Sequence, residues 1–331
     1  MTAETLTRTP TTLEGTSLDE FLELPTERVA RLVQGDGPKT CVFPINGTRR
    51  WFLLEHPDRA QSSQSYIETY MKRSFDIFGL FFDHGIDTVL SPIFGPDLMA
   101  RGEAYRLAVM PAQRWLLQQR ALEFYERHGV RVRFYGDFHR YFENTPYVEV
   151  EEMFDELTRR TSQYGRHRLF FGVCAHDATE TVAQIGIRFH RQHGRPPNKR
   201  EIVEAYYGEH VDPVSFFIGF GQPTVFDMPL VATGNEDLYF TVSPSLYMDE
   251  KTLRSILYDH LYTRRLDEKS YGSMSENEWR KLAAFYAENR HRVLGLGHRY
   301  NDHFWCPLPQ VRVPPCLEND IGTRALQEET K

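Results

Sequence analysis

Six short apolar runs, separated by longer stretches of helical periodicity, limit most strongly what this chain can fold into. Within each run the apolar residues are nearly continuous rather than alternating, which is typical of strands buried on both faces. The runs are residues 41–45, 86–94, 130–135, 168–175, 213–220 and 238–242. Such strands alternating with helices predict an α/β fold with a mostly parallel central sheet flanked by helices on both faces.

The stretches between the runs carry helix signals. In one of them, Ile67, Met71, Phe75, Phe78 and Phe82 repeat at helical spacing and predict a buried helix face. The spacing and the end signals predict helices over 17–33, 59–83, 96–128 with a break near residue 111, 148–162, 176–193, 199–207, 249–265 and 276–289.

The length of 331 residues and the hydrophobic content of 40% suit a chain that buries a large core. We expect a disordered N-terminal tail over residues 1–16, a single domain over 17–305 and a C-terminal surface tail over 306–331. The first of these is rich in threonine and lacks the apolar centre of a signal peptide.

Composition excludes several classes of partner. The net charge of −7 argues against nucleic acid binding. No segment reaches the roughly 20 apolar residues of a membrane span, so we expect a cytoplasmic protein without stable membrane insertion. In that compartment Cys41, Cys174, Cys306 and Cys316, which show no C-x-x-C spacing, are expected to be buried or incidental thiols. The histidines show no metal-ligand spacing either.

Polar or glycine residues follow five of the predicted strands. Because the carboxyl ends of parallel strands meet at one edge of a sheet, a ligand site is expected there. The segments are Asn46-Gly47, Phe94-Gly95, Gly136-Asp137, His176-Asp177 and Gly221-Gln222. Neither G-x-G-x-x-G nor G-x-x-x-x-G-K-[ST] is present, which disfavours a Rossmann dehydrogenase or a P-loop NTPase.

The segment Asn46-Gly47-Thr48-Arg49-Arg50 is the most informative of these strand ends. A glycine turn that exposes backbone N–H groups, followed by two guanidinium groups, suits a phosphorylated ligand. Two alternatives are a hairpin turn, for which Asn-Gly is a strong signal, and an N-x-[ST] glycosylation acceptor. The expected cytoplasmic location removes the second.

The order of these segments resembles the cis-prenyltransferase superfamily, the fold of undecaprenyl diphosphate synthase. That family's D-G-N-x-R-[WF] element is similar to residues 46–51 here, its R-x-R-x-x-G-D segment to residues 131–137, and its E-L-Y-F-T-D segment to residues 237–242. The chain is still more similar to the tuberculosinol synthase type of bacterial diterpene synthases over residues 18–305. The resemblance implies the same fold and a homodimer.

This resemblance implies loss of diphosphate from an allylic diterpenyl diphosphate. Gly47, Thr48, Arg49 and Arg50 would hold the diphosphate together with Mg²⁺, and the cation would form in a dry aromatic pocket. Tyr66 and Tyr105 match tyrosines of the tuberculosinol type, and Phe94 and Phe220 are further candidates for the pocket wall, for which core packing is the alternative.

The chain departs from the family at two points of this site. Asn46 stands where the elongating enzymes carry a metal-binding carboxylate, and an amide is a poor Mg²⁺ ligand and no base. It is either native, which we favour, or a replacement introduced at an aspartate position. Residues 219–223 lack the arginines that hold a second diphosphate, and Gln222 stands where the tuberculosinol type has arginine. Asp237 keeps the late acidic residue that the elongating enzymes use for Mg²⁺.

We therefore predict a diterpene synthase that ionises a bicyclic diterpenyl diphosphate to an olefin or an alcohol. Two alternatives remain: a prenyltransferase that joins an allylic diphosphate to a prenyl diphosphate or nucleoside acceptor, and a non-catalytic subunit of the same fold. Retention of Arg49 and Arg50 argues against the non-catalytic subunit, which needs no diphosphate site.

Overall fold

The computed structural model describes residues 16–59, 63–95, 102, 110–142, 148–264, 272, 274–300, 304–308 and 311–316. The chain divides into two compact units, a main unit of residues 1–220 and 224–262 and a C-terminal unit of residues 221–223 and 263–331. The expected N-terminal tail lies almost wholly outside the described residues. The domain limits at residues 17 and 305 remain predictions.

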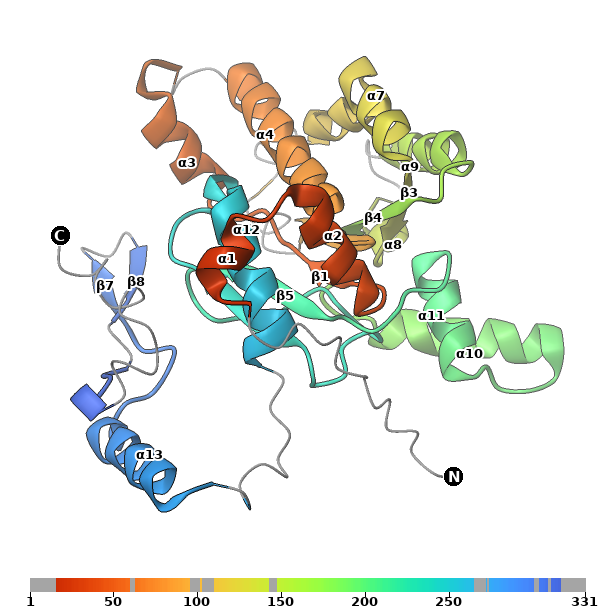
Figure 1. Ribbon diagram of the computed structural model, residues 1–331. Helices are drawn as coiled ribbons and strands as arrows, with labels where there is room; N and C mark the ends of the chain where they lie inside the picture. Colours follow the sequence, from red (N-terminus) through yellow and green to blue (C-terminus); the bar gives the residue numbers. More distant parts are fainter. Residues whose placement is uncertain are drawn as a thin grey trace. The chain divides into compact units, whose positions relative to one another are not determined.

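The main unit is built on a six-stranded sheet in the order β3-β4-β2-β1-β5-β6 (Figure 1). The strands are β1 (Thr40–Val42), β2 (Thr88–Phe94), β3 (Val130–Tyr135), β4 (His167–Val173), β5 (Phe216–Phe220) and β6 (Asp237–Thr241). All five neighbouring pairs are parallel, which confirms the predicted fold class. β1 ends at Val42, before the apolar run 41–45 ends, because Pro44 has no N–H to continue the ladder.

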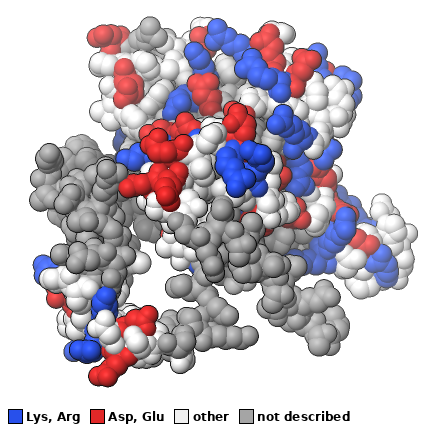
Figure 2. Space-filling model, in the orientation of Figure 1, with Lys and Arg blue, Asp and Glu red and all other residues white. Residues whose placement is uncertain are grey.

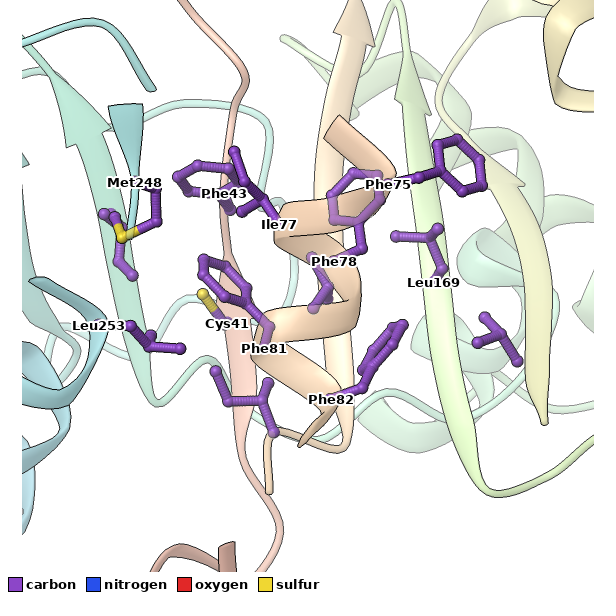
Figure 3. Packing of buried hydrophobic residues seen from close by; sticks show 14 of the residues in the cluster. Cys41, Phe43, Phe75, Ile77, Phe78, Phe81, Phe82, Leu169, Met248 and Leu253 are labelled. Carbon is purple, nitrogen blue, oxygen red and sulfur yellow. The ribbon is translucent and has the colours of Figure 1, made fainter. Parts of the chain in front are cut away.

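Along β1, β4 and β5 successive apolar residues enter different cores, so the middle of the sheet is buried on both faces. Cys41 of β1 and Phe43, the residue after the strand, face helix α4 (Ser63–Asp83), where the rings of Phe43 and Phe81 lie 4.9 Å apart (Figure 3). Val42, between them, belongs to the opposite core with α10 (Thr179–His193) and α11 (Lys199–Tyr207). This double burial explains why the strands are continuously apolar in sequence.

The remaining helices of the main unit mostly follow the predicted ranges. They are α1 (Leu18–Leu22), α2 (Thr26–Gly35), α3 (Thr48–Glu55), α7 (Gln119–His128), α8 (Phe138–Phe142), α9 (Val148–Thr161) and α12 (Glu250–Tyr258). The single helix predicted over 17–33 is two helices, because Pro25 ends one and precedes the other. The described part of 96–128 holds a 3₁₀ segment, Met110–Leu117, before α7.

The C-terminal unit contains helix α13 (Glu276–Asn289) and an antiparallel hairpin of β7 (Gly297–Tyr300) and β8 (Phe304–Pro307). The sequence analysis did not predict this hairpin. Its pairing depends on Gly297, where an added Cβ would lie 1.9 Å from the Trp305 ring.

None of the helices in the described ranges is long and apolar enough to cross a membrane. On the face shown in Figure 2, basic and acidic side chains lie side by side. Exposed ion pairs along single helices, such as Arg160 with Glu156 at 2.8 Å and Arg200 with Glu204 at 2.7 Å, follow the same pattern.

Candidate active site

The loop after β1 leads directly into the N-terminus of α3. Gly47 adopts a left-handed conformation with φ 74° and is the residue before the first turn of α3. An added Cβ at Gly47 would lie 2.7 Å from Cε1 of Phe220 and 3.0 Å from Cβ of Pro244, so glycine alone fits. The hairpin alternative for Asn46-Gly47 is wrong, because a helix follows the turn and β1 is parallel to its neighbours.

The N-terminus of α3 is suited to bind an anion. The first turn of a helix has N–H groups without intrahelical partners, and Gly47 supplies no side chain to cap them. The first turn contains no acidic residue, and its Arg49 and Arg50 side chains are exposed. The helix dipole and the two guanidinium groups therefore place positive charge at one point of the carboxyl edge of the sheet.

The two arginines differ from Arg131 and Arg133 of the main unit. Among the described residues, neither Arg49 nor Arg50 forms an ion pair, whereas Arg131 and Arg133 both contact the Glu209 carboxylate, at 2.8 and 3.4 Å. Arg50 instead lies over the ring of Phe220, with Cζ 5.0 Å from the ring centroid. No described residue thus neutralises the charge of Arg49 and Arg50, whereas Glu209 neutralises the arginines of the family-like segment 131–137.

An aromatic cluster lies beside the same helix terminus. The hydroxyl oxygens of Thr48 and Tyr66 are 2.7 Å apart, which ties Tyr66 on α4 to the first residue of α3. The Tyr66 ring is 5.3 Å from the ring of Phe52 and 5.0 Å from that of Tyr70. The structure therefore brings Tyr66 and Phe220 together with the predicted diphosphate-binding segment.

Ser245 also belongs to this region, and the sequence analysis did not identify it. Its N–H donates to the Asn46 carbonyl at 3.1 Å, and its hydroxyl accepts from the Asn46 N–H at 3.1 Å and donates to the Pro44 carbonyl at 3.2 Å. No local motif marks a residue 199 positions away. The available signal was its place shortly after β6, at the carboxyl edge where the other strand ends lie.

The structure does not assign three other predicted site residues to this site. Phe94 is 3% exposed and packs in a separate core with Phe138 and Phe154, and its role as a pocket wall remains a prediction. Gln222 is exposed and groups with the C-terminal unit. Tyr105 lies outside the described residues.

Asp237 is not at the carboxyl edge. It begins β6, pairs with Phe216 at the amino end of β5, and its Oδ2 lies 2.6 Å from Nδ1 of buried His260. The strand reaches the carboxyl edge of the sheet, where the candidate site lies, at Thr241. Thr241 is four residues further along, so the rise of a strand places it about 13 Å from Asp237. The physical reason is its position at the start of the strand, since the two ends of a parallel strand lie at opposite edges of the sheet.

Among the described residues, Asn46 and Asp237 do not together make a protein-held Mg²⁺ site. Mg²⁺ is usually bound through one or two carboxylates plus substrate phosphates, and here Asn46 offers an amide while Asp237 is remote. No group of three or more His, Cys, Asp or Glu residues in the described ranges is arranged to hold a metal. The use of Mg²⁺ with the diphosphate therefore remains a prediction from the resemblance.

The carboxyl ends of β3 and β4 carry Asp137 and Cys174. Desolvation raises the pKa of the Asp137 carboxyl, and Cys174 has a left-handed φ of 52°. Burial raises the pKa of the Cys174 thiol to about 12, with Asp137 and Asp227 adding to the shift. A thiol with that pKa stays protonated near neutral pH, so Cys174 is not an activated nucleophile.

Two known proteins are similar to this chain over most of its length. The chain is 45% identical over 281 residues to tuberculosinyl adenosine transferase of Mycobacterium tuberculosis, covering 84% of this chain and 94% of that protein. It is 25% identical over 297 residues to (+)-kolavelool synthase of Herpetosiphon aurantiacus, covering 88% of this chain and 95% of that protein. No family model matches the chain.

A solved structure supports the fold. Lavandulyl diphosphate synthase from Lavandula x intermedia, crystallised with dimethylallyl diphosphate, matches with a TM-score of 0.56 over 71% of this chain and 97% of that chain. The sequence identity is 14%, so this match concerns the fold alone.

Proposed function

This chain belongs to the family of tuberculosinyl adenosine transferase, and on that basis we propose that it is a terpene synthase that ionises an allylic bicyclic diterpenyl diphosphate. The observation that carries the proposal is the uncapped N-terminus of α3 with Arg49 and Arg50, whose charges no described acidic residue neutralises. Such a cationic site suits the diphosphate of a leaving group.

Each residue of the site has a distinct part in the proposed reaction. The guanidinium groups and the N–H groups of α3 stabilise the negative charge that accumulates on the diphosphate as the C–O bond breaks. The faces of Tyr66 and Phe220 stabilise the allylic cation that remains. The reaction ends when the cation loses a proton or takes up water.

Asn46 bears on how the reaction ends. Its amide is no base, and both its main-chain groups are bonded to Ser245. The proton would therefore go to the departing diphosphate or to a tyrosine, which favours an olefin. The runner-up function is transfer of the diterpenyl group to an acceptor, which the name of the transferase relative supports.

The experiment is incubation with geranylgeranyl diphosphate and with labdane- and halimane-type diterpenyl diphosphates, with Mg²⁺ present, followed by mass analysis. We expect a C20 olefin or alcohol from a bicyclic substrate. A product formed only when a nucleoside or prenyl diphosphate acceptor is added would favour transfer. Absence of turnover with all substrates would contradict both enzyme functions.

The assembly and location are part of the same proposal. We propose a cytoplasmic homodimer. β6 is the last strand on one side of the sheet. Leu238 on β6 and Val242 directly after it are 40% and 72% exposed. Sedimentation of the purified chain would measure its mass in solution, and a monomer at micromolar concentration would contradict the dimer.

A further inference from the structure

We propose that Pro244–Met248, the segment after β6, positions the diphosphate site without touching the substrate, and that Ser245 is its principal positioning residue. This inference rests on the proposed function. The segment, called the brace here, contacts the loop before α3, the end of α3 and helix α4 through separate hydrogen bonds.

The first contact fixes the loop before α3. Ser245 is 1% exposed, and its three hydrogen bonds occupy the main-chain N–H and C=O of Asn46 and the C=O of Pro44. Because both main-chain groups of Asn46 are held, the direction in which the chain enters Gly47 is set. The N–H groups in the first turn of α3 therefore have a fixed orientation.

The second contact holds the other end of α3. The hydroxyl of Tyr247 donates to Oε1 of Glu55 at 2.6 Å, and Glu55 is the last residue of α3. Ser245 and Tyr247 together thus fix a helix of eight residues at both ends. A helix held at both ends keeps Arg49 and Arg50 at a constant position relative to the sheet.

The third contact links the brace to the aromatic wall. Arg73 on α4 donates from Nε to the Leu246 carbonyl at 2.9 Å and from Nη2 to the Met248 carbonyl at 2.6 Å. Arg73 lies seven residues after Tyr66, two turns along the same helix face. The brace therefore fixes the distance between the diphosphate site and the ring that would meet the cation.

Positioning of this kind acts on catalysis through geometry. Displacement of about 1 Å at a reacting centre can lower a rate by two orders of magnitude. In the Ser245→Ala variant, the Asn46 N–H and the Pro44 carbonyl lose their partner, and the loop is free to turn away. The hydroxyl that the change removes is buried, because Ser245 is 1% exposed.

The test compares Ser245→Ala with Ser243→Ala in the full chain. Ser243 lies on the same loop, is exposed, and its side chain has no hydrogen bond within the described residues. Calorimetry gives the Kd of inorganic diphosphate, and steady-state assays with a turned-over diterpenyl diphosphate give kcat and KM separately. We expect Ser245→Ala to raise the Kd about tenfold and to lower kcat at least tenfold, with Ser243→Ala unchanged. Arg73→Gln should also lower kcat at least tenfold. It replaces Ser245→Ala as the test variant if Ser245→Ala does not fold.

The outcomes separate the inference from the proposed function. A Ser245→Ala or Arg73→Gln protein that unfolds at a lower temperature but keeps the wild-type Kd and kcat would overturn the positioning role, because a merely structural contact changes stability alone. A wild-type protein that does not bind diphosphate would overturn the proposed function itself, and this inference with it.

Discussion

Replacement of Arg50 tests the diphosphate site at the point where the structure is most specific. Its guanidinium is exposed, lies 5.0 Å from the Phe220 ring centroid, and forms no ion pair with any described residue. Arg50→Ala therefore removes no native salt bridge. We expect the free energy of unfolding to change by no more than about 1 kcal/mol, the value of an exposed cation–π contact.

The effect on catalysis should be larger than the effect on stability. A hydrogen bond to a charged group contributes about 1.5–3 kcal/mol, and 1.36 kcal/mol corresponds to tenfold in rate. Arg50→Ala should therefore lower kcat/KM by roughly 10- to 150-fold. Arg50→Lys should fall between wild type and alanine, because lysine keeps the charge but not the planar fork.

The assay is steady-state kcat/KM with the diterpenyl diphosphate, alongside thermal unfolding. Arg188 on α10 is a matched control, because it is an exposed arginine without an ion pair in the described part of the chain. Arg188→Ala should leave kcat/KM unchanged. Equal kcat/KM in wild type and Arg50→Ala would refute the assignment of the site.

Three further predictions concern single side chains. Tyr66→Phe should keep most of the rate if the ring stabilises the cation, whereas Tyr66→Ala should lose about 0.5–2 kcal/mol of that stabilisation; equal rates in both variants would show that Tyr66 is structural. Asn46→Asp should weaken substrate binding by about 1 kcal/mol or more without Mg²⁺, measured as KM, because it adds a negative charge beside the diphosphate; a gain in turnover of orders of magnitude with the same product would contradict a native amide. Burial lowers the pKa of His84, whose Nε2 accepts a hydrogen bond from Nε of Arg254 at 3.2 Å. As the pH falls, the unfolded chain therefore protonates this imidazole before the folded chain does. The free energy of unfolding should then decrease as the pH drops below about 6.5. Urea unfolding at pH 7.5 and 5.5 measures this loss, and an equal loss in His84→Gln would refute the role of His84.

The sheet could be predicted because its signal is local. Each strand is a short apolar run, and double burial makes those runs continuous, as Cys41, Val42 and Phe43 illustrate. The hairpin of β7 and β8 could not be predicted in the same way, because Gly297–Tyr300 carries few apolar residues. Its stability depends on Trp305 packing where Gly297 has no side chain.

The part of the candidate site that is contiguous in sequence could be proposed from the sequence, whereas the part that the fold assembles could not. Gly47 to Arg50 follow one strand, so their shared place needed no tertiary information. Ser245 reaches Asn46 only through the parallel pairing of β1, β5 and β6. Asp237 shows the converse. Its resemblance in sequence could not indicate that Asp237, at the start of β6, lies at the opposite edge of the sheet from the residues that follow the strands.

Diphosphate release in a single turnover, without any acceptor, tests the central claim most directly. Excess enzyme is mixed with a bicyclic diterpenyl diphosphate and Mg²⁺, and free diphosphate and the C20 product are measured together over time. The proposed function predicts one diphosphate released per substrate, with a matching amount of olefin or alcohol. Release that begins only when an acceptor is added, or no release at all, would contradict it.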